Sequence, residues 1–423
     1  MRSASTILFK KCWAQMVKTI TEHPVAWLNA ELGIGQANWD HAECLALGQT
    51  QMHRLFPTIA LVSEKSSDFS YSSESCLNLD ELAWPDPLRP ARLIDTNTFL
   101  NRRLFNDGLI VLQGRQCIHE SYRNGFTAKD RHVIHSCTKS FCSFLIAQAV
   151  AEGKLDPDAS IQQYVSELQS IAAWEGVTLE HVWDMQAGIL YSEDYSDPDA
   201  HYWSYAKAAG YYPAGKDEAI GIRAWVSRHL TERQTAPGTA FLYNSTLTNI
   251  LGMALETVYG QSLGELFEQR LYRHCGAEQD AWFNTDREGF PIVEGQLNLT
   301  LKDFAKLAYP LINKGKSLSG VELVPSSFIS SLVKVDQRQQ AIYQANETDM
   351  VFSKGQYQKQ FWVLEPETQC FTMLGIHGQF AWCDLQHQIL IVGVGSYPRQ
   401  DGTLMMTTLR QLWHTIRDKI IQS

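Results

Sequence analysis

Residues 133–153 read VIHSCTKSFCSFLIAQAVAEG, and from Ser136 onward the stretch is apolar on nearly every side. This pattern predicts a buried helix from Ser136 to Glu152 that ends at Gly153. Ser136 and Lys139 are three residues apart, so the helix places them on one face, one turn from each other. The serine at the mouth of this helix is therefore either a helix cap or an activated nucleophile.

The residues alone leave both interpretations of Ser136 open. Serine is a favoured N-cap residue. A helix N-terminus also offers unpaired N–H groups and a positive potential, which stabilise an oxyanion and disfavour a charged Lys139. We expect burial to lower the pKa of Lys139 further, which would make this lysine a base towards Ser136.

Two other serine patterns favour structural roles. GQSLG at 260–264 matches the G-x-S-x-G motif, but a helix rather than a strand precedes it, and Ser262 with Glu265 forms a capping-box pattern. A second S-x-x-K pair, Ser331 and Lys334, lies midway and near the end of its own predicted helix. Lysine there favours the negative end of the helix dipole, so this pair is interpreted as structural.

The cysteines supply one competing nucleophile. A thiol at a helix N-terminus, such as Cys137, has a lowered pKa and is reactive if it is exposed. However, Cys137 lies about 100° round the helix from Ser136 and has no lysine three residues later. The nine cysteines are scattered and show no CxxC spacing, so we expect buried thiols in a reducing compartment, with no metal and no cofactor.

Composition excludes several classes of protein. The 423 residues are 44% hydrophobic and 19% charged, with a net charge of -10, and no basic stripe suited to nucleic acid stands out. No apolar run is long enough to cross a membrane. The apolar run near the start, Ile7 to Phe9, is cut by Lys10 and Lys11 and is too short for a signal peptide. We therefore expect a cytoplasmic protein; the sequence does not determine its oligomeric state.

The order of predicted elements indicates an α+β fold. GLIVLQGRQCIHESY at 108–122 predicts two strands joined at Gly114-Arg115, and 361–398 predicts three or four more before a final helix from Thr403 to Ile421. An antiparallel sheet built from both halves, flanked by helices and interrupted by an all-helical insertion, fits this order. The predicted parts are an N-terminal extension with a serine-rich loop (1–95), the first part of the sheet domain (96–155), the helical insertion (156–340) and the second part of the sheet domain (341–423).

Two further stretches add candidate functional residues. PGTAFLYNS at 237–245 places Tyr243 after a Pro-Gly turn and just before another predicted helix. FTMLGIHGQ at 371–379 is a strand pattern with Gly375 and Gly378 three residues apart. Glycine in a strand marks a bulge or a close approach of the backbone to a ligand.

From about residue 96 to the C-terminus the chain resembles the serine β-lactamase and penicillin-recognising hydrolases of class C type. The segments HSCTKSF, DMQAGILYSEDYSDP, PGTAFLYNS and LGIHGQ occur in that family's order and are most similar to its nylon-oligomer hydrolase and carboxylesterase branch. The resemblance implies the β-lactamase/transpeptidase-like fold.

The resemblance also implies roles for individual residues. Ser136 would be acylated, Lys139 would be its base, and Tyr243 would shuttle protons to the leaving group. The N–H groups of Ser136 and Ile376 would form the oxyanion hole.

On the substrate side, the resemblance implies that Tyr195 contacts the substrate amide and that Gly375 and His377 border the bound substrate. For His377 a structural hydrogen-bonding role is the simpler interpretation. Two departures matter: Ser245 stands where the family has asparagine, and Met373 stands where it has the lysine that grips a carboxylate.

These departures argue against an efficient β-lactamase and favour small esters or linear amides resembling 6-aminohexanoate oligomers. The alternatives are β-lactamase or D-aminopeptidase activity, and a ligand-binding module that is acylated without turnover. A further possibility is that residues 1–95 bind a partner protein.

Overall fold

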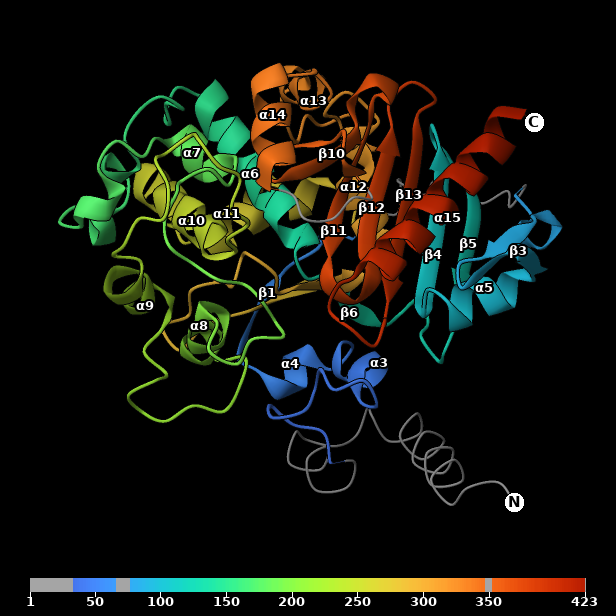
Figure 1. The fold of residues 1–423 in the computed structure, drawn as a ribbon, viewed down its shortest axis with the longest axis horizontal. Coiled ribbons are helices and arrows are strands. Elements are labelled where there is room, and N and C mark those ends of the chain that lie inside the picture. The colour runs from blue at the N-terminus through green and yellow to red at the C-terminus, as the bar shows by residue number, and fades with distance from the viewer. Residues whose placement is uncertain (1–32, 66–76, 347–351, 423) are drawn as a thin grey trace.

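The computed structural model describes residues 33–65, 77–346 and 352–422 (Figure 1). The basic start of the chain and most of the serine-rich stretch lie outside these ranges.

The largest element is an antiparallel sheet of seven strands in the order β5-β4-β13-β12-β11-β10-β9. As predicted, both halves of the chain build it, because β4 pairs with β13. Gly114, with φ 55°, makes the predicted turn between β4 and β5. The strands are β4 (Asn106–Gln113), β5 (Gln116–Tyr122), β9 (Gln356–Gln358), β10 (Phe361–Glu365), β11 (Cys370–Gly375), β12 (Gln379–Asp384) and β13 (Ile389–Gly395).

Alternation along the strands gives the sheet two apolar faces. Leu109 and Val111 of β4 pack into the core under helix α15 (Thr403–Gln422), whereas Ile110 and Leu112 point into the core on the other side. Helix α15 lies across the sheet in Figure 1. The sheet is therefore buried on both faces, between α15 and the helical part of the molecule.

The second face of the sheet packs against α6 (Cys137–Ala151) and α12 (Leu301–Ala308). Helix α6 is buried along most of its length, as its apolar sequence predicts. The predicted capping box of Ser262 and Glu265 begins α11. The remaining helices are α3 (Leu45–Gly48), α4 (Met52–Leu55), α5 (Thr96–Arg102), α7 (Leu179–Trp183), α8 (His201–Ala209), α9 (Ile222–His229), α10 (Thr246–Tyr259), α11 (Leu263–Arg270), α13 (Ser326–Leu332) and α14 (Gln337–Asn346).

A second sheet departs from the expectation of an all-helical insertion. Its order is β1-β7-β8-β6, with β1 (Thr58–Leu61), β6 (Arg131–Val133), β7 (Ala281–Asn284) and β8 (Leu297–Thr300). Strands β7 and β8 come from within 156–340, so that segment contains strands as well as helices. Each is only four residues long, too short for alternation to distinguish a strand from a loop.

The described part of the N-terminal segment is packed into the fold. Strand β1 pairs with β7, and the hairpin of β2 (Trp84–Asp86) and β3 (Arg89–Ile94) contributes Trp84 and Ile94 to the core beneath α15. Trp39 and its neighbours pack on Val133, close to the start of α6. We therefore regard 33–65 and 77–95 as part of the folded body; the division into four parts stays a prediction.

Within the described ranges, no helix is both long and apolar enough to cross a membrane.

Candidate active site

Ser136 lies at a turn from strand β6 into helix α6. The Ile134 N–H donates to the Leu297 carbonyl and so continues the pairing of β6 with β8. His135 then adopts φ 45°, an uncommon conformation for a residue other than glycine. Ser136 occupies the N-cap position, but its side chain caps nothing. Its hydroxyl is therefore available for chemistry.

Lys139 points at this hydroxyl. Its Nζ donates to Ser136 Oγ at 2.8 Å and to the Glu294 carbonyl oxygen at 2.6 Å. The side chain is 1% exposed. A buried lysine needs partners of this kind, and here one of them is the serine hydroxyl. The contact favours the nucleophile over the cap as the role of Ser136.

The charge state of Lys139 differs from the sequence-based expectation. Burial by itself lowers its pKa, but its interactions with Tyr243 and with the carboxylates of Glu294 and Glu193 outweigh burial, and the net shift is upward. The expected lowering of the pKa was wrong because the carboxylates arrive from segments far away in sequence. In the resting protein Lys139 is an ammonium that donates to Ser136.

Tyr243 completes the group. Its hydroxyl interacts with both Ser136 and Lys139, and Nζ of Lys139 lies 5.3 Å from the centre of its ring. Burial raises the pKa of Tyr243, against the effect of the Lys139 ammonium. Trp362 stacks on the ring, with centroids 5.6 Å apart. Tyr243 is thus held as a neutral phenol that can donate a proton.

The end of strand β11 lies beside the start of α6. A Cβ atom at Gly375 would be 2.7 Å from the Ile134 carbonyl oxygen and 3.1 Å from the His135 Cβ, so only glycine allows this approach. Ile376 follows it. The N–H groups of Ser136 and Ile376 have no hydrogen-bond acceptor among the described residues. They are available to bind a developing oxyanion.

These groups open into a cavity of about 600 Å³. Its apolar wall comes from the Tyr243 loop, α14, β10 and the start of α15. The charged residues among its described lining are Glu193 and Asp401; lysine and arginine are absent from that lining. The apolar side chains of the lining include Phe241, Trp362, Leu374, Met405 and Met406. This volume suits a small molecule with an apolar chain.

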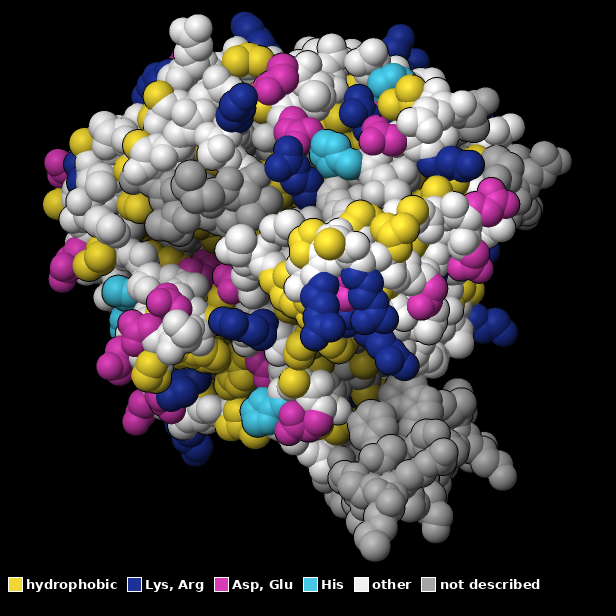
Figure 2. Space-filling view, turned by 45° about the vertical axis from the view of Figure 1, so that its right-hand side comes forward, with side chains coloured by type: hydrophobic (Ala, Val, Ile, Leu, Met, Phe, Trp, Pro, Cys, Tyr) yellow, Lys and Arg dark blue, Asp and Glu magenta, His cyan; other side chains and the backbone are white. Residues whose placement is uncertain are grey.

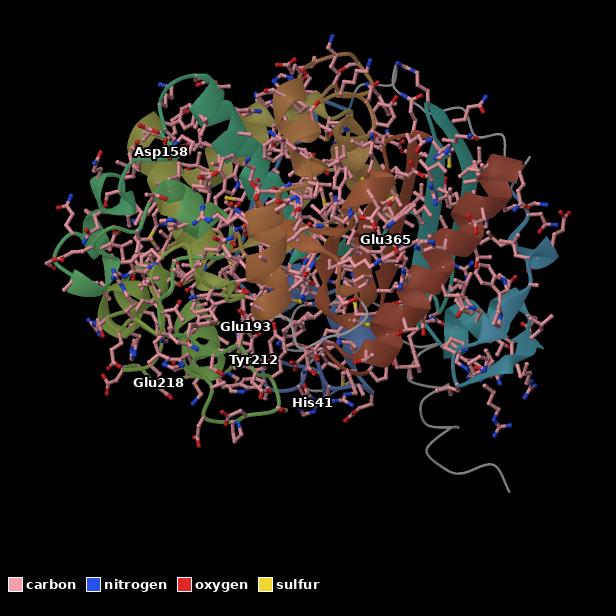
Figure 3. The ribbon with its side chains drawn as sticks, turned by 45° about the horizontal axis from the view of Figure 1, so that its top comes forward. His41, Asp158, Glu193, Tyr212, Glu218 and Glu365 are labelled. Atoms are coloured by element: carbon pink, nitrogen blue, oxygen red, sulfur yellow. The ribbon has the colours of Figure 1, made fainter. Side chains whose placement is uncertain are left out.

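Glu193 and Tyr195 lie at one wall of the cavity. The Tyr195 hydroxyl donates to Glu193 Oε1 at 2.8 Å, and Ser245 donates to Glu193 from its N–H at 2.8 Å and from its hydroxyl at 2.6 Å. In the view of Figure 3, Glu193 lies closer to the middle of the molecule than Glu218 does. Ser245, the departure from the family asparagine, thus holds a carboxylate.

Two candidate residues, His377 and Cys137, do not line this cavity. His377 Nδ1 pairs with the Tyr397 carbonyl oxygen at 2.8 Å, and its ring lines a small cavity behind Ile376 together with His135. Cys137 is fully buried, and burial raises the pKa of its thiol well above the usual value. The expected reactivity of Cys137 required exposure, so the structure argues against a thiol nucleophile.

The sequence did not identify Glu193, Glu294 and Trp362 as part of this site. Glu193 stands two residues before Tyr195, so the segment EDYSDP carried a signal that could have been used. Glu294 and Trp362 lie in stretches with no recognisable motif. In the described ranges, no cluster of three or more His, Cys, Asp or Glu side chains is arranged to hold a metal ion.

Comparison with known proteins identifies the family. The Beta-lactamase family model matches residues 102–397. The 6-aminohexanoate-dimer hydrolase of Paenarthrobacter ureafaciens is 29% identical over 402 residues, which cover 95% of this chain and 96% of that protein.

Solved structures share the fold. A Bacillus anthracis protein named for the same activity superposes with a TM-score of 0.80 at 22% identity, over 92% of this chain and 97% of that one. A D-stereospecific amidohydrolase from Streptomyces sp. gives a TM-score of 0.51 at 15% identity, over 73% and 97%. From the family match and this architecture, the chain belongs to the beta-lactamase family and is a serine hydrolase.

Proposed function

We propose that Ser136 is the nucleophile of an acyl-enzyme mechanism, with Lys139 as its base and Tyr243 as the proton donor to the leaving group. The observation that carries this proposal is the 2.8 Å contact between Lys139 Nζ and Ser136 Oγ at the edge of the cavity. A nucleophile and a base within hydrogen-bonding distance are the signature of covalent catalysis.

The proposed acylation uses these groups in turn. The proton of Ser136 passes to the deprotonated form of Lys139 as Oγ bonds to the substrate carbonyl carbon. The N–H groups of Ser136 and Ile376 stabilise the oxyanion. Tyr243 protonates the leaving amine or alcohol as its bond to carbon breaks, and it regains a proton from the Lys139 ammonium with which it interacts. Water then hydrolyses the acyl ester and releases Ser136.

The lining of the cavity favours small esters and linear amides resembling 6-aminohexanoate oligomers. A β-lactam or a D-alanyl peptide carries its carboxylate a few bonds from the carbonyl that reacts, where a cation would be needed to bind it, and the described lining provides neither lysine nor arginine. A 6-aminohexanoate oligomer also ends in a carboxylate, but its methylene chain keeps that group away from the reacting amide. Met373 stands at the position of the family lysine and is buried in β11. Tyr195 and Gly375 border the space beside Ser136 and would contact the substrate.

The test is a fluorophosphonate probe followed by intact-protein mass spectrometry and peptide mapping. A single adduct on Ser136, absent from Ser136→Ala, is expected. An adduct on another residue, or none, would refute the assignment of the nucleophile.

A substrate panel then separates the functions within the family. We expect steady turnover of p-nitrophenyl esters and of 6-aminohexanoate dimer, and little turnover of nitrocefin. One equivalent of product without further turnover would instead indicate an acylated binding module. Efficient nitrocefin hydrolysis would favour the β-lactamase alternative.

We also propose a cytoplasmic location. The seven cysteines of the described ranges are free thiols, and six of them are buried. Free thiols are usual in a reducing compartment. Fractionation of the native host, with detection of the full chain, tests this location.

A further inference from the structure

Glu294 contacts the proposed base twice, although no motif marks it. It lies in the loop between β7 and β8 and is 5% exposed. Its carbonyl oxygen accepts a hydrogen bond from Lys139 Nζ at 2.6 Å, and its Oε2 lies 3.9 Å from the same nitrogen. One residue therefore fixes the position of the lysine and supplies a charge opposite to it.

The carboxylate is itself held by two tyrosines. The Tyr205 hydroxyl donates to Glu294 Oε1 at 3.0 Å, and the Tyr211 hydroxyl donates to the same oxygen. Asn249 Nδ2 donates to the Tyr205 hydroxyl at 2.7 Å. All these side chains are buried, and hydrogen bonds of this kind orient a buried charge.

The other carboxylate near Lys139 is engaged elsewhere. Glu193 accepts three hydrogen bonds, one from Tyr195 and two from Ser245. Glu294 is the carboxylate in ion-pair distance of Lys139 within the described ranges. A buried lysine whose charge rises and falls during a reaction needs such a partner.

We propose that Glu294 is the counter-ion of Lys139: it positions the lysine and stabilises the ammonium that forms when Ser136 attacks the substrate. The inference rests on the proposed function. In that step the bond between Oγ and the carbonyl carbon forms, and the hydroxyl proton moves to Nζ. Glu294 neither gains nor loses a proton, and it does not touch the substrate, so it is a positioning residue.

Other titratable groups face the pair of Lys139 and Glu294 and contribute to its electrostatic surroundings. Tyr243 and Glu193 lie on the cavity side. Tyr191 and Tyr202 interact with the Glu294 charge, and His135 with the Lys139 charge. Burial keeps these two tyrosines and His135 neutral, because it raises the pKa of Tyr191 and Tyr202 and lowers that of His135. These two tyrosines and His135 therefore supply no second negative charge that could replace that of Glu294.

The experiment compares Glu294→Gln with the wild-type full chain. The rate constant of fluorophosphonate labelling and kcat/KM for a p-nitrophenyl ester are measured across pH 5–11. Burial raises the pKa of Glu294, against the effect of the Lys139 ammonium, so its charge is complete towards the alkaline part of this range. In the wild type that charge holds Lys139 protonated, and the rate therefore rises with pH into the alkaline range. In Glu294→Gln we expect this rise to move to lower pH by about one unit or more. The plateau falls about tenfold because the ammonium formed during acylation loses its counter-ion.

Three controls interpret the result. Glu278→Gln makes the same chemical change beside another buried lysine, Lys306, whose Nζ lies 2.8 Å from Glu278 Oε1; we expect an unchanged pH profile. Tyr211→Phe removes one donor from Glu294 and should move the profile in the same direction by a smaller amount. If Glu294→Gln does not fold, the pH profile of Tyr211→Phe decides whether Glu294 acts on Lys139. Ser136→Ala gives the rates of labelling and of ester hydrolysis that do not depend on Ser136.

Two outcomes would overturn the inference. A lowered plateau with an unmoved pH profile would show that Glu294 only supports the fold, and a fully wild-type profile would show that it has no role in the reaction. A wild-type protein that is not labelled on Ser136 would refute the proposed nucleophile first, and with it the role of Glu294.

Discussion

The two S-x-x-K sequences of this chain have opposite environments. At Ser136 the serine begins a buried helix, and Lys139, 1% exposed, donates to its hydroxyl. At Ser331 the serine is near the end of α13, and its hydroxyl donates to the Phe328 carbonyl oxygen at 2.7 Å. Lys334 lies beyond that helix and is exposed.

The comparison shows that the motif has no chemistry of its own. The spacing would place serine and lysine on one helical face, but α13 ends at Leu332, before Lys334. Burial of the lysine and the position of the serine at a helix start decide whether the two side chains meet. The first pair also opens into a cavity, which the second does not line.

The largest difference between the two pairs is expected for loss of the serine. Ser136→Ala should lower kcat/KM for a p-nitrophenyl ester by about 10⁴-fold or more, because no nucleophile remains. Ser331→Ala removes only a local hydrogen bond and should leave kcat/KM unchanged. Equal effects of the two changes would contradict the assignment.

Loss of the lysine is expected to have the next largest effect. Lys139→Met should lower kcat/KM about 10³-fold, the usual contribution of a positioned base, whereas Lys334→Met should have no effect. The pKa of Lys139 is raised, so its neutral, reactive form increases as pH rises. The wild-type rate should therefore increase with pH, and this dependence should disappear in Lys139→Met. A pH profile of both variants checks this.

A smaller effect is expected where β11 approaches Ser136. Gly375→Ala places a Cβ 2.7 Å from the Ile134 carbonyl oxygen, so β11 must shift and carry Ile376 with it. We expect kcat to fall about 10- to 100-fold, with a smaller change in KM, since one oxyanion donor is displaced.

Gly215→Ala is the matched control for Gly375→Ala. Its added Cβ lies 3.5 Å from the nearest atom, in ordinary contact, and we expect wild-type kinetics. If kcat of Gly375→Ala were also unchanged, Ile376 would not belong to the oxyanion hole.

The smallest effect is expected for the thiol of Cys137, beside the proposed nucleophile. Cys137 is buried, and burial raises its pKa. Cys137→Ala should leave kcat/KM close to that of the wild type and lower the free energy of unfolding by roughly 1 kcal/mol, from the small cavity it leaves. Iodoacetamide should not label Cys137 in the folded protein. If iodoacetamide labelled Cys137 and removed activity, the result would support Cys137 as the nucleophile.

Much of the fold could be predicted because its signals are local. The apolar run after Ser136 predicted α6, and Gly114 predicted the turn between β4 and β5. Strands β7 and β8 could not be predicted because each has only four residues and finds its partner far away in sequence.

The sequence by itself determined the α+β architecture and, through a few short motifs and the family they resemble, it indicated Ser136, Lys139 and Tyr243 as the proposed catalytic residues. Periodicity, capping and motif order need only neighbouring residues, so one chain suffices to read them. Only the tertiary structure decided the charge of Lys139. Its partners Glu294 and Glu193 come from distant loops, and the electrostatic energy of a buried charge depends on distances in space that no sequence spacing fixes.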